Sequence, residues 1–274
     1  MRTRIFLFFL IVLPILLTSC TPAPSPEMTL KVSPSPLAQC ALASVHVRIA
    51  NPNQHDWLDY ELLLYYGPEN NSIKELGPHP ADNWEGSTGF ISELPLSLPA
   101  GQVFERDIPW LVGYLDSQDK EYRLQLFLFN SEEKSVAETA IPVEFVNPTV
   151  TMAVSPTQLS LNSEATITFQ VSNPSAASLA CCLWISYRVK ENDSIIIKMI
   201  PVPLEPGETL HQEITWTVDN IPAVGDNEVE AMLLAPDMPS PDLEEVTAML
   251  LGPDKCNNGF EVTSVRVPIT FSQP

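Results

Sequence analysis

The feature that most constrains the fold of this chain is an internal repeat. Three groups of residues in the first half recur in the same order in the second half: Val32-Ser33-Pro34 as Val154-Ser155-Pro156, Asn51-Pro52 as Asn173-Pro174, and Leu98 to Gly101, with Trp110, as Leu204 to Gly207, with Trp216. The first two groups recur 122 positions later and the last 106 positions later. The chain therefore contains two copies of one domain, and the first copy has a 16-residue excess between Tyr66 and Leu98.

Each copy has the pattern of an all-β domain, because short runs of Thr, Val, Ile and aromatic residues alternate with Pro, Asn and Gly. The strands expected in the first copy are about 28–33, 43–50, 57–66, 102–112, 121–130 and 135–146, with one or two short strands in the excess. Those expected in the second are about 150–155, 163–172, 182–191, 194–202, 208–219, 227–234 and 260–271. Strands at this spacing predict two tandem immunoglobulin-like or fibronectin-like β-sandwiches.

The order of turn signals also resembles a known family. A strand ends in Asn173-Pro174, a polar hairpin follows, and Leu204 to Glu208 (Leu-Glu-Pro-Gly-Glu) precedes another strand. This order is similar to bacterial adhesion-type Ig-like domains, of which the cell-adhesion-related bacterial domain is the nearest. The resemblance covers most of each copy and implies an immunoglobulin-like sandwich.

The N-terminus has the proportions of a cleavable leader. Arg2 and Arg4 precede an apolar run, 5–17, that is shorter than the roughly 20 residues a membrane-spanning helix needs. Leu17-Thr18-Ser19-Cys20 then resembles the lipobox of bacterial lipoproteins. The resemblance implies cleavage before Cys20, acyl chains such as palmitate on that residue, and attachment to the extracytoplasmic face of a cell membrane, at the surface or in the periplasm. An uncleaved N-terminal anchor and an ordinary leader with an incidental Cys20 are the alternatives.

These signals divide the chain into four parts. We expect a lipoprotein signal peptide over 1–19, a proline-rich tether over 20–27, a first sandwich over 28–147 and a second over 148–274. Alternating prolines in 21–26 favour an extended tether.

Composition excludes some classes of partner. The formal net charge of −20 argues against nucleic acid and anionic lipid, because both bind basic surfaces. No phosphate-binding loop, H-E-x-x-H motif or G-x-S-x-G motif occurs in the sequence. We therefore expect a protein that is not an enzyme and has no cofactor and no metal site.

Four further cysteines, Cys40, Cys181, Cys182 and Cys256, are disulfide candidates, because disulfides form readily outside the cytoplasm. In a head-to-tail tandem, all four would lie near the junction of the two sandwiches. The hypothesis is that Cys256 pairs with Cys181 or Cys182, and that Cys40 takes the remaining one across the junction. One disulfide with free thiols is an alternative, and a four-thiolate zinc site is a third, although the spacing is unlike that of zinc ligands.

Two loops are tentative ligand sites. His55 and Trp57 lie in a connection of the first copy, and His79, Asp82 and Trp84 lie in its excess. Imidazole can bind metal and aromatic rings can stack on sugars, but a solvated loop with one anchoring Trp explains the same residues.

Three other features favour structural interpretations. Trp110 and Trp216 share strand parity with apolar neighbours, which predicts a buried role. Ser240, Pro241 and the acidic residues after them predict a short helix in the loop 235–259, which would cover one end of the sandwich or bind a partner.

The functional expectation is a membrane-anchored lipoprotein that acts as a noncatalytic binding or spacer module in the cell envelope, with a protein or glycan as its ligand. The alternative is an accessory subunit that presents substrate to an envelope enzyme or transporter. A tether at the upper end of the first sandwich would turn the lower loops of the second, around Leu161-Asn162 and after Asp219, toward a distant partner.

Overall fold

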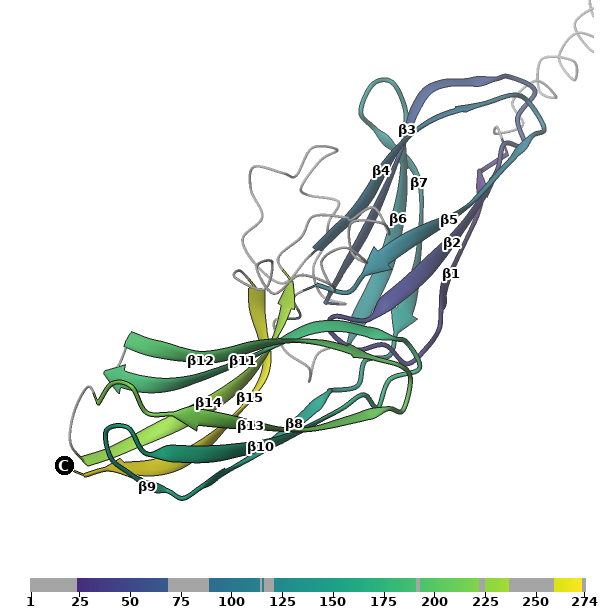
Figure 1. Cartoon of the computed structure of the whole chain (residues 1–274). Coiled ribbons are helices and arrows are strands. Elements are labelled where there is room, and N and C mark those ends of the chain that lie inside the picture. The colour runs from purple at the N-terminus through teal and green to yellow at the C-terminus, as the bar shows by residue number, and fades with distance from the viewer. Residues whose placement is uncertain are drawn as a thin grey trace, which may run out of the picture.

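The structure is a computed structural model that describes residues 24–68, 89–113, 115, 121–190, 193–221, 225–236 and 259–272. Two β-sandwiches follow one another along the chain and meet at a bend (Figure 1). No helix occurs within the described residues, and these therefore offer no helix that could cross a membrane. The all-β fold class predicted from the repeat is confirmed.

The first sandwich packs a sheet of three strands against a sheet of four. Its strands are β1 (Glu27–Ser33), β2 (Leu42–Ala50), β3 (Trp57–Pro68), β4 (Gly89–Leu98), β5 (Val103–Leu111), β6 (Tyr122–Phe129) and β7 (Ser135–Val143). The strand orders are β1-β2-β5 and β4-β3-β6-β7, and all pairs are antiparallel. This arrangement of a three-stranded and a four-stranded sheet belongs to the sandwich architecture that immunoglobulin-like and fibronectin-type domains share.

The second sandwich repeats the same plan with one additional strand. Its strands are β8 (Thr149–Ser155), β9 (Gln158–Leu159), β10 (Glu164–Ser172), β11 (Leu179–Lys190), β12 (Asp193–Leu204), β13 (Thr209–Thr217), β14 (Gly225–Pro236) and β15 (Gly259–Phe271). The orders are β13-β10-β8 and β12-β11-β14-β15-β9, with β9 parallel to β15. β9 is only two residues long and no strand was expected there, while β4 has ten residues and is longer than the short strands predicted in the excess.

The core of each sandwich follows the alternation of the sequence. Val45, Val47 and Ile49 in β2 are fully buried, and their counterparts in β10, Ile167, Phe169 and Val171, are buried as well. Successive strand residues point to opposite faces, so every second residue of these strands faces the partner sheet.

One aromatic group fills the centre of each core. In the first sandwich Trp110 packs against Tyr66 at 5.2 Å and Phe145 at 6.4 Å between ring centroids. In the second, Trp216 packs against Tyr187 and Phe271 at the same two distances. Both Trp residues are more than nine-tenths buried, which confirms their predicted core role.

The central tyrosines are held in their neutral form. Burial raises the pKa of Tyr66 above its usual value, and the nearby Tyr122 adds to this effect. Burial also raises the pKa of Tyr187, with a further contribution from Asp219. A phenolate would lose its hydration in either core, so the charged form is disfavoured.

The repeated Asn-Pro marks a buried hydrogen-bonding residue. In the second sandwich Asn173 is 1% exposed, and its Nδ2 donates to the carbonyl oxygens of Ala177 (2.8 Å), Leu204 (3.2 Å) and Glu205 (3.0 Å). Its Oδ1 accepts from the backbone N of Ser175 (3.0 Å) and from the Ser175 hydroxyl (2.7 Å). One side chain thus joins the β10–β11 connection to the end of β12.

In the first sandwich the equivalent Asn51 donates the same three hydrogen bonds. Its Nδ2 donates to the carbonyl oxygens of His55 (2.9 Å), Leu98 (3.0 Å) and Pro99 (3.3 Å), and its Oδ1 accepts from the backbone N of Asn53 (3.0 Å). The repeated Asn therefore holds two connections together at one end of each sandwich. It bonds to the last residue of β4 or β12, which explains why the Asn recurs together with the segment that begins at Leu98 or Leu204.

The repeated Gly has a backbone role. Gly101 and Gly207 have φ of 70° and 72°, a conformation that L side chains rarely adopt. Their amides donate to the carbonyl oxygens of Asn51 and Asn173, both at 2.9 Å. Each Gly thus turns the chain back onto the buried Asn.

Candidate functional site

The junction between the sandwiches contains a disulfide bond between Cys40 and Cys181, whose Cα atoms are 5.5 Å apart. Cys40 lies in the connection between β1 and β2, and Cys181 lies near the start of β11. Both residues are almost completely buried. The expectation that Cys40 forms a bond across the junction is confirmed, and its partner is Cys181 rather than Cys182.

Cys182 is disulfide-bonded too, with a partner outside the described residues. Cys256 also lies outside them, so its pairing with Cys182 stays a prediction. Because Cys40 and Cys181 are bonded to each other, the four-thiolate zinc alternative is wrong.

Backbone hydrogen bonds connect the same two segments. The amide of Leu42 donates to the carbonyl of Ser178 (2.9 Å), and the amide of Ala180 donates to the carbonyl of Cys40 (2.8 Å). A third bond, 2.9 Å long, runs from the amide of Ala176 to the carbonyl of Pro36. The first sandwich thus docks its β1–β2 connection against the β10–β11 connection of the second.

The linker between the two sandwiches, residues 144–148, is also held by the β1–β2 connection. Leu37, which is fully buried, donates from its amide to the carbonyl of Glu144 (2.9 Å), and its carbonyl accepts from the amide of Val146 (2.8 Å). These two bonds pair Leu37 with Phe145 as an isolated parallel bridge. The five residues between β7 and β8 are therefore part of the junction, which we call the joint, and do not form a free linker.

The connection that forms the joint has an equivalent at the free end of the second sandwich. Cys40 has φ of 62° and its amide donates to the carbonyl of Val112 (2.8 Å). The corresponding Asn162 has φ of 64° and donates to the carbonyl of Val218 (2.7 Å). The backbone is thus the same in both copies, but at the free end the neighbouring Leu161 is 43% exposed.

The predicted ligand loops are only partly described. His79, Asp82 and Trp84 lie outside the described residues. Trp57 is 4% exposed and stacks on Tyr60 with 5.2 Å between ring centroids. The tentative assignment of Trp57 to a ligand site is therefore wrong, because its ring is a core contact; His55 nearby is exposed.

Among the histidines that the structure describes, His46 has the most defined surroundings. On the exposed face of β2, its Nδ1 lies 2.8 Å from Asp107 Oδ1 and its Nε2 lies 3.1 Å from Glu105 Oε1, both on β5. Since each ring nitrogen faces a different carboxylate, the three side chains do not converge on one point. The described residues contain no group of three or more His, Cys, Asp or Glu side chains suited to hold a metal ion.

A second charged group lies on the outer face of the second sandwich. Glu230 of β14 is 8% exposed at its side chain and accepts a 2.6 Å hydrogen bond from Arg266 Nε on β15. Arg188 Nη2 on β11 is 3.7 Å from the other carboxylate oxygen. The side chains of Arg266 and Arg188 are 47% and 39% exposed, so Glu230 is the buried member of the group.

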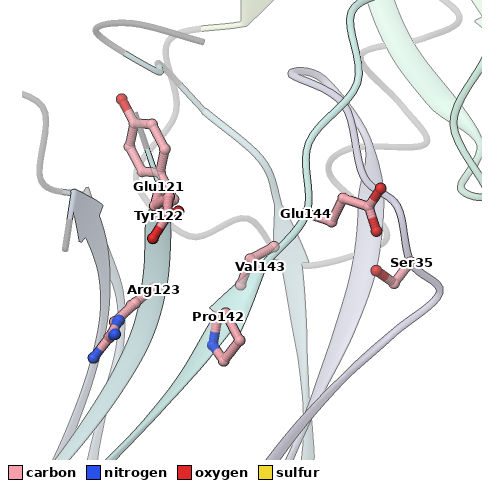
Figure 2. A pocket seen from close by; sticks show the side chains of 7 residues that line it. All are labelled: Ser35, Glu121, Tyr122, Arg123, Pro142, Val143 and Glu144. Carbon is pink, nitrogen blue, oxygen red and sulfur yellow. The ribbon is translucent and has the colours of Figure 1, made fainter. Parts of the chain in front are cut away.

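A shallow hollow of about 420 Å³ lies beside the joint, between the start of β6 and the end of β7 (Figure 2). Its lining residues are Ser35, Glu121, Tyr122, Arg123, Pro142, Val143 and Glu144. The rim carries charges of both signs, and Ser35 and Glu144 stand on its far side from Arg123 (Figure 2). Such a mixed, open rim selects neither anions nor cations.

Comparisons with known proteins identify no family: no family model matches the chain and no curated protein is similar to it. Among solved structures, red sea bream transglutaminase matches with a TM-score of 0.31 and 10% identity, over 90% of this chain and 31% of that one. A β-glucosidase from Erythrobacter marinus matches with a TM-score of 0.30 and 13% identity, over 46% of this chain and 15% of that one. The chain thus spans less than a third of either protein, and likeness at this level says nothing about activity.

Proposed function

We propose that this protein is a noncatalytic, lipid-anchored module of a cell envelope, in which two sandwiches with a fixed relative orientation hold a binding surface away from the membrane. The observation that carries the proposal is the Cys40–Cys181 disulfide between the sandwiches. Disulfides persist in oxidising compartments and are rare in the cytosol. The bond therefore supports export, which is also what the lipobox-like Leu17-Thr18-Ser19-Cys20 implies.

The design of the joint supports a spacer role. One disulfide and three backbone hydrogen bonds connect the two sandwiches, and the Leu37 bridge holds the first sandwich to the linker. Domains joined by a plain linker are expected to move relative to each other. Here a change of angle would break several of these contacts at once, so the relative orientation of the sandwiches is fixed.

The binding surface of the proposed module lies at the end of the second sandwich farthest from the tether. Leu161 is exposed there, next to Asn162. The partner is an envelope protein or a glycan, and the charge of −20 disfavours nucleic acid.

The anchor is tested by mass spectrometry of the N-terminal peptide from the membrane fraction of cells that express the full chain. We expect a peptide that begins at Cys20 and carries lipid, and a Cys20→Ser variant that is absent from the membrane fraction. An unmodified Cys20 in membrane-associated protein would contradict the proposal.

The spacer role is tested by distance measurements between the sandwiches. Spin labels are attached through unnatural amino acids at Val136 and Glu213, which are exposed and lie on β7 and β13. We expect one narrow distance distribution, and a broader one in the Cys40→Ala/Cys181→Ala double variant. A broad distribution in the unaltered protein would contradict a fixed orientation.

A further inference from the structure

The first sandwich presents an apolar side chain at the end opposite the joint. Leu58, near the start of β3, is 64% exposed, and no other large apolar side chain within the described residues is more exposed. A single exposed leucine is common on protein surfaces. The backbone around Leu58 shows that its position is built into the fold.

A β-bulge projects Leu58 from the sheet. Trp57 pairs with Leu98 and Tyr60 pairs with Leu96, so two residues of β3 oppose one residue of β4. The second of these two residues, Asp59, has φ of 57°. A bulge bends its strand and redirects a side chain, and here the stacked rings of Trp57 and Tyr60 remain in place while Leu58 turns outward.

The second sandwich has no such bulge at this position. The counterpart of Leu58 is Ala180, which pairs regularly with Pro203 and is 3% exposed in the joint. The connection before Leu58 is also firmly held, because Asn51 binds the His55 carbonyl and Asp56 Oδ1 accepts from the amide of Ala100 at 2.9 Å. The end with Leu58 is therefore a rigid surface that differs from the copy used in the joint.

This end is also where the tether enters. Glu27, the first residue of β1, is in register with Ala50, and Ala50 is in register with Val103 at the start of β5. Val103 is 44% exposed. Cys20 precedes Glu27 by seven residues, a length of chain that spans at most about 25 Å. A lipid on Cys20 would thus keep Leu58 and Val103 close to the membrane surface.

We infer that this end of the first sandwich contacts the lipid surface, with Leu58 inserted at the boundary between headgroups and acyl chains. The inference rests on the proposed lipid anchor and adds a second point of contact to it. Two such contacts fix how the first sandwich stands on the membrane, which a tether alone does not. Asp56 and Asp59 flank Leu58, so the surface suits zwitterionic lipid and is repelled by anionic lipid.

The experiment uses the lipidated full chain reconstituted into phosphatidylcholine vesicles. An environment-sensitive fluorescent amino acid replaces Leu58 in one variant and, as a matched control, Leu161 in another, because Leu161 is also exposed but lies at the far end. Lipids with nitroxide groups then quench any fluorophore that enters the bilayer surface. We expect loss of fluorescence at position 58 and none at position 161, with less loss at position 58 when anionic lipid is added.

The outcomes separate the two proposals. Equal responses at positions 58 and 161 in protein that carries lipid on Cys20 and sediments with the vesicles would overturn the contact and leave the anchor intact. Protein that has no lipid on Cys20 and does not sediment would overturn the anchor together with the contact.

Discussion

Replacing Asn173 by Ala should destabilise the second sandwich strongly, although the residue lies in a connection and not in a strand. The change removes three hydrogen bonds donated by Nδ2 and two accepted by Oδ1, in a site that is 1% exposed. A neutral hydrogen bond contributes about 1 kcal/mol to stability, and some of the released carbonyl groups will reach water. We therefore expect a loss of roughly 3 to 5 kcal/mol in the free energy of unfolding.

The first sandwich supplies a matched comparison inside the same molecule. Asn51 makes the same three donor contacts, but its Oδ1 accepts only from the backbone of Asn53. The position of Ser175, whose hydroxyl binds Asn173, is taken by Asn53 in the first copy. Asn51→Ala should therefore cost less than Asn173→Ala by about 1 kcal/mol.

Hydrogen exchange at increasing denaturant, read by mass spectrometry, is the suitable assay because it reports the two sandwiches separately. Peptides from β10 and β13 should lose protection in Asn173→Ala, and peptides from β2 and β5 in Asn51→Ala. Asn173→Asp is the control for shape, since it keeps the side-chain size but directs a carboxylate at three carbonyl oxygens. The reasoning is refuted if Asn173→Ala costs less than about 1 kcal/mol, or if Asn173→Asp is as stable as the unaltered protein.

Three further predictions test other parts of the structure. Gly207→Ala should cost about 1 kcal/mol in thermal or chemical unfolding, because an L residue is disfavoured at its φ of 72° while no atom lies near the added Cβ. Arg266→Ala should destabilise the protein more than Glu230→Gln, because only the first leaves a buried carboxylate short of its partner; equal losses in chemical denaturation would contradict this order. The contribution of Tyr66 and Tyr187 to stability should be constant up to about pH 10 and be lost above it, because their raised pKa values keep them neutral in the fold while the unfolded chain ionises. Phenolate absorbance that rises fully near pH 10 without unfolding would be the contrary result.

Most strands could be predicted from the sequence because a strand with one buried and one exposed face alternates apolar and polar residues. In β10, for example, Ile167, Phe169 and Val171 alternate with polar residues, and the observed strand Glu164–Ser172 differs from the expected 163–172 by one residue. β9 was missed because two residues are too few to show any alternation.

The repeated motifs were visible in the sequence, but their physical roles were not. Asn51-Pro52 and Asn173-Pro174 have the composition of a turn, and nothing in the sequence indicates that the Asn side chain is buried. The aromatic groups around Trp110 and Trp216 were missed for another reason. Tyr66 corresponds to Tyr187 at a spacing that differs by one residue from the spacing of the flanking motifs, so a comparison at a fixed offset does not align the two tyrosines.

The candidate site was predictable only to the level of the junction. The predicted topology placed Cys40 and the pair Cys181-Cys182 at the junction of the two sandwiches. Adjacent strand residues point to opposite faces, however, and the sequence does not reveal which face of the strand meets the other sandwich. The structure resolves this choice in favour of Cys181.

The joint has a consequence for how proteins of this architecture change in length. The first copy binds its successor through the connection that contains Cys40, and the second copy keeps the same connection, in the same backbone conformation, around Asn162. A duplication that added a third copy would thus find the same backbone at that connection, although Asn162 in place of Cys40 offers no disulfide. The reach of such a protein would then grow in steps of one sandwich, so the number of copies would set how far its last domain stands from its first.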